Sequence, residues 1–481
     1  MLITHSLPPG RLVGAFSCVG NGITLPAVRS AHGRSVLDCV SIEIHANRTY
    51  MAAFASPDVR LHSDMIPLVR DEFLAPALAL VESLDKHLEN LDFSDPEFIT
   101  LGVRRINSLH PSGRAFLQSV RQCDLTDVSL RAYFNAASSP RRLAMLHELN
   151  AKLALTVEST TDRFACFEEL AGRDILAIDG HDIRHGSHEP KAVMASGRLE
   201  TPDTVTGIFL RNLRTGAARV LAQTSGHQHE WAAVKAQPWS EFAWRPKARG
   251  TILVIDPVAV DFGFLRGAKL KGGATVITRM KAGMNVVESR PLEWNGADKR
   301  NEGVVSDERV RFNTAGEFRR IHYRDPETGE LYELLTTEFH LAPGVIAHLY
   351  RLRWDIEKFF DVCENLLAEK KAWGTGPIPA QVQNEFLALV HNLLLRMSRR
   401  LEEDEGIRDE KVEEKFAEAL KARRKAAAAE GGKVSFWVAA LRRITRWSSQ
   451  FTRWLQDAII HDWSWTAGVS KLRPLMRAYM R

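Results

Sequence analysis

Apolar residues recur at steps of three and four between Pro343 and Gly374, the spacing of one buried helix face. A second stripe, Tyr350, Arg353 and Glu357, lies about 100° round the same helix, so these polar side chains share a face. Pro343 suits a first turn and Gly374 a helix end, so we predict one long helix with a buried and a polar face. The members of the buried stripe are Leu349, Leu352, Ile356, Phe359, Cys363 and Leu367.

Upstream of this helix, two short apolar runs end at acidic residues. Residues 175–178 and 251–255 have the length and composition of buried strands, and Asp179 and Asp256 follow them directly. Strand and helix patterns alternate around these runs. We therefore predict an α/β core, with a carboxylate delivered at the end of two of its strands.

Turn signals divide the remainder of the chain. Thr215 and Gly216 predict a hairpin between the two acids, and residues 325–329 predict another in a stretch that reads as β-rich. The β-rich stretch interrupts the core before the long helix. The predicted domains are residues 1–55 without an assigned function, 56–170 helical, 171–281 the first part of the core, 282–338 the β-rich insertion, 339–376 the last core helix, and 377–481 a helical C-terminal domain.

Helical periodicity before the core predicts segments near residues 75–91, 113–122, 128–136 and 140–155. Small helical domains with basic faces are common DNA-binding modules, but no clear helix-turn-helix pattern is present. A DNA-binding role for this block therefore stays open. Its arginines include Arg104, Arg105, Arg114, Arg121, Arg131, Arg141 and Arg142.

Composition places the chain among ordinary globular proteins, with 481 residues, 45% hydrophobic and 26% charged. No apolar run approaches the ~20 residues that span a bilayer, and no signal pattern is visible. The cysteines have neither zinc-site spacing nor a disulfide framework, which favours a reducing compartment. We expect a cytoplasmic protein without a membrane partner. The five cysteines are Cys18, Cys39, Cys123, Cys166 and Cys363.

Positive charge gathers at the C-terminal end. Residues 439–481 hold eight Lys or Arg against Asp457 and Asp462, a local surplus of +6 in a chain whose net charge is +5. Such a patch with interleaved tryptophans suits a nucleic-acid backbone, and a helical tail with a solvated basic face explains it equally well. The tryptophans are Trp447, Trp454, Trp463 and Trp465.

The acids suggest a metal site. If Asp179, Asp256 and Glu357 converge, their mutual repulsion requires cations. Mg²⁺ or Mn²⁺ suits carboxylate oxygens and keeps positions open for water and phosphate. Two such ions about 4 Å apart can activate a nucleophile and stabilise a leaving oxygen in phosphodiester chemistry.

The same residues carry a resemblance to a known family. The acids after the two strands and the run 349–357 resemble the DDE transposases of bacterial insertion sequences. The match is to the cut-and-paste group whose last acid lies in a Tyr-x2-Arg-x3-Glu-x6-Lys signature on a helix, here Tyr350, Arg353 and Glu357. It covers roughly residues 174–373.

The resemblance implies a ribonuclease H-like core, a mixed sheet with flanking helices, interrupted by the β-rich insertion. It implies Asp179, Asp256 and Glu357 as a catalytic triad that binds two Mg²⁺ ions, with Tyr350 and Arg353 in contact with DNA. Relatives of this kind excise the element by hydrolysis and use the freed 3′-hydroxyl to attack target DNA. The implied partners are double-stranded DNA, both terminal inverted repeats and target, and a second copy of the chain, at the bacterial nucleoid.

Two positions depart from the signature, and three further residues are weaker candidates for DNA contact. Glu364 stands where the signature has Lys, and Pro257 follows the second acid where relatives often have Arg. Trp294 suits stacking on a flipped base, although a packed hairpin tryptophan is the more frequent case. Arg279 and Lys281 leave a core strand and suit phosphate binding or a structural salt bridge.

Other readings stay open. Asp182, Asp261, Asp355 and Asp361 are rival carboxylates, of which Asp355 faces away from Glu357 on the helix. A catalytically silent DNA-binding protein with a transposase fold would explain Glu364. A structure-selective nuclease without strand transfer would share the same core.

Overall fold

The computed structural model of the chain divides into two compact units, Met1–Ile66 and Pro67–Arg481. The description that follows concerns the second unit, so the predicted segment 1–55 lies outside it. The structure describes residues 67–478 except 90, 109, 111, 159–161, 185–203, 225–229, 247, 257–260, 282, 314–315, 327, 368–371, 375, 408–409 and 430–448.

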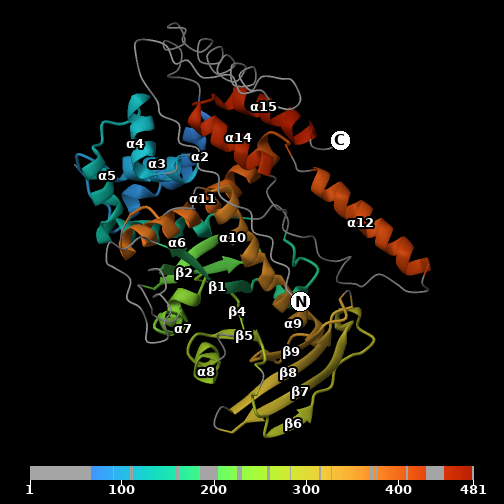
Figure 1. The fold of residues 1–481 in the computed structure, drawn as a ribbon. Helices are drawn as coiled ribbons and strands as arrows, with labels where there is room; N and C mark the ends of the chain where they lie inside the picture. The colour runs from blue at the N-terminus through green and yellow to red at the C-terminus, as the bar shows by residue number, and fades with distance from the viewer. Residues whose placement is uncertain are drawn as a thin grey trace, which may run out of the picture. The chain divides into compact units, whose positions relative to one another are not determined.

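A mixed sheet forms the centre of the unit, and nine of its strands lie among the described residues (Figure 1). Their order across the sheet is β3-β2-β1-β4-β5-β9-β8-β7-β6. β1, β4 and β5 run parallel, and the other neighbours pair antiparallel. The strands are β1 Asp174–Arg184, β2 Thr204–Asn212, β3 Ala218–Gln223, β4 Thr251–Ile255, β5 Ala274–Arg279, β6 Glu288–Pro291, β7 Val304–Phe312, β8 Gly316–Arg324 and β9 Leu331–Thr336.

The predicted hairpins are confirmed, and so is β4 with the bounds expected from its apolar run. Gly216 in the first hairpin has a φ of +80°, a conformation that glycine adopts without strain. The prediction that the first core strand ends before Asp179 is wrong. β1 continues to Arg184 because its antiparallel partner β2 extends past the end of β4, with Asp179 opposite Phe209.

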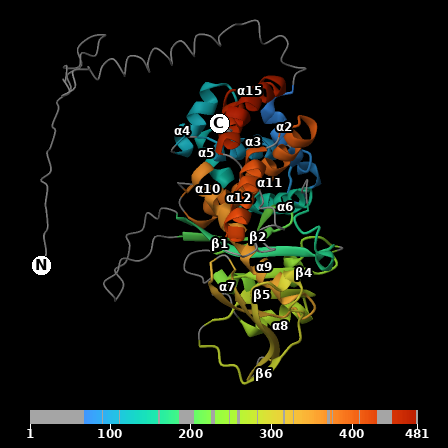
Figure 2. The same cartoon turned by 90° about the vertical axis from the view of Figure 1, so that its right-hand side faces the viewer.

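The β-rich stretch is continuous with the core sheet. β9 pairs antiparallel with β5, which places Ile277 opposite Thr336, and β8, β7 and β6 follow outward. Figure 2 shows β6 at one end of the unit, and α2, α3 and α15 at the opposite end. The sheet with its flanking helices is compatible with a ribonuclease H-like transposase fold.

Helices cover both faces of the sheet because alternate strand residues point to opposite sides. On β1, Ile175 and Ala177 belong to the core shared with α10 and α11, whereas Leu176 and Ile178 belong to the core shared with α7 and α8. The helices are α2 Val69–Leu78, α3 Asp95–Ile106, α4 Gly113–Gln122, α5 Leu130–Ala137, α6 Pro140–Leu155, α7 Glu230–Lys235, α8 Phe262–Leu270, α9 Pro343–Arg351, α10 Asp355–Leu366, α11 Pro377–Asp404, α12 Glu410–Ala429, α14 Ser449–Ile460 and α15 Trp465–Ala478.

The long helix predicted from Pro343 to Gly374 is interrupted. A tighter 3₁₀ turn, Leu352–Trp354, separates α9 from α10, and α10 ends at Leu366 because Leu367 has an extended backbone. The apolar stripe nevertheless continues through the interruption, since Leu349, Leu352, Ile356 and Phe359 are all buried. The spacing of apolar residues therefore predicted the buried face correctly, but it predicted the ends of the helix incorrectly.

The helical block before the core differs from its prediction in its first part. The segment near 75–91 is wrong: α2 ends at Leu78, and the chain is extended again at Leu84. We did not predict α3, although Ser94 caps it and a proline stands in its first turn, which are recognised start signals. α4, α5 and α6 lie where the periodicity placed them.

α11 joins this block to the sheet, since it packs against α6 and α3 as well as β3. Its buried residues lie on every side, as expected for a helix enclosed by other elements. None of the described helices is long and apolar enough to cross a membrane.

The C-terminal tryptophans take part in packing. Trp454 is buried and donates its indole hydrogen to Gly468 O at 2.8 Å. Arg400 lies over the ring of Trp465 and Lys471 over that of Trp463, at 4.4 and 3.6 Å from the ring centres. These three rings therefore support the structural alternative for the C-terminal patch, and Trp447 lies outside the described residues.

Candidate active site

Two parallel strands bring Asp179 and Asp256 side by side. The last pair in register between β1 and β4 is Ile178 opposite Ile255. Asp179 is the next residue of β1, which continues, and Asp256 directly follows the end of β4. Adjacent apolar runs in the sequence thus produce adjacent carboxylates in space.

The third acid approaches from α10, and all three meet at one arginine. Arg353, in the 3₁₀ turn before α10, lies 2.7 Å from Asp179 Oδ2 through Nη1. The same Nη1 is 3.7 Å from Glu357 Oε1, and Nη2 is 3.5 Å from Asp256 Oδ2. The structure therefore brings the three predicted acids together around a guanidinium that is 9% exposed.

Negative charge exceeds positive charge in this cluster, with three carboxylates around one guanidinium. Burial raises the pKa of Asp179 to about 6, and the charges of Glu357 and Asp256 act in the same direction. Arg353 and the amide of Gly180, which donates to Asp179 Oδ1 at 2.9 Å, lower it. Glu357 is 43% exposed and Asp256 34%, so the cluster is open to solvent on their side.

Two neighbours of Asp179 on β1 shape the surroundings of the site. A Cβ on Gly180 would lie 2.7 Å from a carboxylate oxygen of Glu230, so a larger residue here would displace that side chain at the start of α7. His181 stacks on Phe360 of α10 with ring centres 4.8 Å apart, and its Nδ1 is 3.9 Å from Glu364. The residue that departs from the signature is thus the neighbour of a histidine close to the cluster.

The rival carboxylates have structural partners. Asp355 is buried against Arg163, at 2.6 Å, and also contacts Lys358. Asp182 accepts a hydrogen bond from Thr206, and Asp261 caps α8 through the amide of Phe264. Asp361 is exposed and lies one turn beyond Glu357 on α10.

The predicted DNA-contacting residues are more dispersed. Tyr350 is half-buried beside Arg353, and burial raises the pKa of its hydroxyl. Arg279 forms an ion pair with Glu330 at 3.5 Å and lies over the ring of Tyr332, which favours the structural alternative. Lys281 is exposed after β5, and Trp294 is half-buried in the loop after β6.

Sequence reasoning missed the position of Arg353 at the centre of the three acids, and it missed His181 altogether. The sequence spacing of both residues relative to the predicted acids could have indicated them. Arg353 precedes Glu357 by four residues on a helix, and His181 follows Asp179 by two on a strand, so each shares a face with a predicted acid. Which distant residue each face meets was not visible from spacing.

The donor set suits a hard divalent cation because it consists of carboxylate oxygens with excess negative charge. Within the described part of the chain, no three acidic, histidine or cysteine side chains are grouped closely enough to hold a metal as they stand. The acids are gathered around the Arg353 guanidinium, which occupies the position between them where a cation balances their charge.

Comparison with known proteins adds a family to this geometry. No curated protein matched the chain. A family model described as the transposase DDE domain matches residues 170–393, which include all three acids and Arg353. This segment of the chain is therefore similar to the transposase DDE domain.

Proposed function

We propose that the protein is a cut-and-paste DNA transposase and that Asp179, Asp256 and Glu357 are its catalytic acids. The observation that carries the proposal is the convergence of these three carboxylates on Arg353 within the segment that matches the transposase domain. The rival acids of the core do not share this position. The proposed partners are the two ends of the element, target DNA and a second copy of the chain.

In this proposal the three carboxylates hold Mg²⁺, two ions per site, with Mn²⁺ able to replace it. The bound metal supplies activation of the attacking oxygen and charge stabilisation at the phosphate. Water attacks the phosphodiester at the element end, and the bond to the 3′-oxygen breaks to leave a 3′-hydroxyl. That hydroxyl then attacks a target phosphodiester and releases a target 3′-hydroxyl.

Arg353 and Tyr350 act on the DNA rather than on the acids once substrate is bound. Arg353 carries a charge that a phosphate can accept in bidentate fashion, and it must turn away from the carboxylates to do so. Tyr350 lies beside it on the same helical face. Arg279, Lys281 and Trp294 are further proposed DNA contacts, with Trp294 stacking on an exposed base.

The test uses labelled DNA that carries the flanking genomic ends of this gene, with Mg²⁺, and compares wild type with Glu357→Gln. Wild type is expected to cut and to join the product to target DNA. Glu357→Gln should bind DNA with unchanged affinity and lose at least ~10²-fold in cutting, since even residues that only support a metal ligand cost 10–100-fold. Asp361→Asn removes the same charge one turn further along α10, from an acid that is not one of the three that meet at Arg353, and should cut normally.

Other outcomes identify the alternatives. Binding without cutting by wild type, in Mg²⁺ and in Mn²⁺, would establish a silent DNA-binding protein. Nicking without joined products would establish a nuclease without strand transfer. Equal losses in Glu357→Gln and Asp361→Asn would remove the special role of Glu357.

A further inference from the structure

The arginines of the helical block 56–170 divide into two groups. Arg104 pairs with Asp462 at 2.9 Å, and Arg105 lies over the ring of Trp373 at 4.3 Å. Arg141 and Arg142 both bind the buried Asp95. Arg141 and Arg142 thus hold the block together, whereas Arg104 and Arg105 connect it to other parts of the chain, so these four side chains are already engaged.

The second group faces solvent. Arg114, Arg121 and Arg131 are exposed, and none of their guanidinium groups forms a hydrogen bond or ion pair with any described residue. All three come from α4 and the start of α5. Unpaired cations concentrated on one part of a surface are the electrostatic signature of a polyanion partner.

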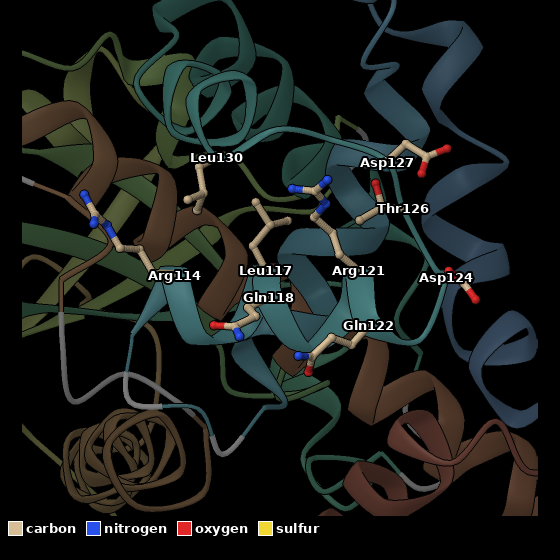
Figure 3. A pocket seen from close by; sticks show the side chains of 9 residues that line it. All are labelled: Arg114, Leu117, Gln118, Arg121, Gln122, Asp124, Thr126, Asp127 and Leu130. Carbon is tan, nitrogen blue, oxygen red and sulfur yellow. The ribbon is translucent and has the colours of Figure 1, made fainter.

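α4 presents a polar face with a distinct composition. Its exposed residues Arg114, Gln118, Arg121 and Gln122 fall within about 100° of the helix circumference. We call these four residues the α4 surface. Figure 3 shows their side chains along the helix, beside a shallow hollow that Leu117 and Leu130 help to line. α4 contains no acidic residue.

The helix beneath this surface is firmly held. Phe116, Leu117 and Val120 are buried on the opposite face, and Phe116 packs on Tyr133 with ring centres 6.2 Å apart. Ser112 caps the first turn through the amide of Ala115. A rigid helix with an unpaired polar face loses little freedom when a partner binds it.

The residue types point to DNA rather than to another anion. Arginine often contacts guanine and phosphate, and glutamine can form two hydrogen bonds with N6 and N7 on the major-groove edge of adenine. A single α-helix fits the major groove of a duplex. Asp124 and Asp127 stand at one end of the hollow and repel phosphate there, so DNA must approach from the side of Arg114.

We propose that the α4 surface binds duplex DNA, with Arg114 and Arg121 supplying charge and Gln118 and Gln122 supplying preference for particular bases. The inference rests on the proposed function, because it assigns the surface by which the transposase recognises a DNA end. It reverses part of the sequence interpretation: only a minority of the arginines in the block serve DNA, and they do so from one helix.

The experiment measures binding of the full chain to two duplexes, one with the flanking genomic ends of this gene and one scrambled, over a range of salt. Arg114→Ala/Arg121→Ala should weaken binding to both and reduce the salt slope by about two. Gln118→Ala/Gln122→Ala should leave the slope unchanged and reduce the preference for the end by roughly fivefold or more.

Arg266→Ala/Lys271→Ala serves as the control, because it removes two exposed cations from the region of α8. It should alter the slope by less than one and leave the preference intact. All the substituted side chains are exposed, so the thermal unfolding midpoint should not move. A variant with a shifted midpoint is replaced by its Arg→Gln or Gln→Ser equivalent.

The outcomes separate this inference from the proposed function. If wild type binds and cuts the end while both α4 variants match it in affinity, slope and preference, the α4 surface serves another partner, such as an acidic protein, and the inference is wrong. If the arginine variant and the control reduce the salt slope of DNA binding equally, the α4 surface contributes no more than any other cationic surface, and the inference is wrong. If wild type binds neither duplex, the proposed function fails before the α4 surface is in question.

Discussion

Two charge clusters of this protein are built from the same types of side chain, arginines and carboxylates, but in opposite proportions. Around Asp95, Arg141 Nη2 and Arg142 Nε lie 2.7 and 3.0 Å from one carboxylate that is fully buried. Around Arg353, three carboxylates share one guanidinium, and two of them are open to solvent. The first cluster has more cations than acids, and the second has more acids than cations.

The pKa values of the two aspartates express this difference. Burial opposes ionisation of both. At Asp95 the hydrogen bonds and charges of Arg141 and Arg142 overcome burial and lower the pKa. At Asp179 a single Arg353 does not, and the pKa rises to about 6. A cluster that is saturated with cations stabilises the fold, whereas one left with excess negative charge retains affinity for another cation.

The largest expected effect is on the saturated cluster. Asp95→Asn leaves the buried Arg142 and the partly buried Arg141 without their carboxylate, and breaking a buried ion pair costs about 3–5 kcal/mol of unfolding free energy. Urea unfolding measures the loss. Glu158→Gln breaks a solvent-exposed pair with Arg399 and should cost much less, because water screens such pairs. Equal costs for the two variants would contradict the distinction.

Acidity should affect the two clusters in opposite directions. Asp179 binds its proton more tightly in the folded state, so its contribution to stability is complete below about pH 3.8 and is lost as pH rises towards its folded pKa of about 6. The loss amounts to roughly 3 kcal/mol at most. The contribution of Asp95 is present above about pH 3.8 and is lost as pH falls through its lowered pKa.

Asp179→Asn tests this difference. The variant should lose less unfolding free energy than wild type between about pH 4 and about pH 7, because it lacks the group that resists ionisation. Guanidinium unfolding at several pH values gives the two curves. Parallel curves would show that Asp179 does not carry the excess charge of the site.

A smaller effect is expected from Arg353→Gln, which removes the cation of the unsaturated cluster. An ion pair near 4 Å is worth a few kcal/mol at an effective dielectric of about 20, so the variant should bind Mg²⁺ or Mn²⁺ at least roughly tenfold more tightly without DNA. Calorimetric titration of the protein alone measures this. Arg279→Gln, whose cation pairs with Glu330, is the control and should titrate like wild type.

The smallest effect concerns Glu364, an exposed acid 3.9 Å from His181. Glu364→Lys restores the lysine of the signature and should increase the steepness of the salt dependence of DNA binding by about one, with less than about 1 kcal/mol change in stability. Glu364→Gln removes the carboxylate without adding a positive charge, so it separates the effect of losing the acid from the effect of gaining the lysine. If Lys and Gln bind DNA equally, position 364 does not contact phosphate.

Local pattern predicted the elements that carry the acids. β4 and both hairpins follow from alternation and turn residues, and the side-by-side placement of Asp179 and Asp256 follows from two similar runs that end in acids. These features depend on a few neighbouring residues. The bounds of the helix around Arg353 did not follow, because a single 3₁₀ turn leaves the apolar stripe unchanged.

The roles of charged residues were the least predictable. Arg104, Arg142 and Arg114 all lie in helices of the same block, yet the first two pair with Asp462 and Asp95 while the third faces solvent. Such pairing depends on chain segments that meet only in the folded state. The same reason explains why Arg353 was predicted to contact DNA and lies among the acids in this structure.

The distance along the chain between the parts of the site also governs when activity can arise. Arg353 and Asp179 are 174 residues apart, and Glu357 comes later still. Contacts between such distant segments form late in folding, and ribosomes add only about 5–20 residues per second. A growing or partly folded chain therefore carries its acids apart, and the proposed site is complete only when the last core helix has docked.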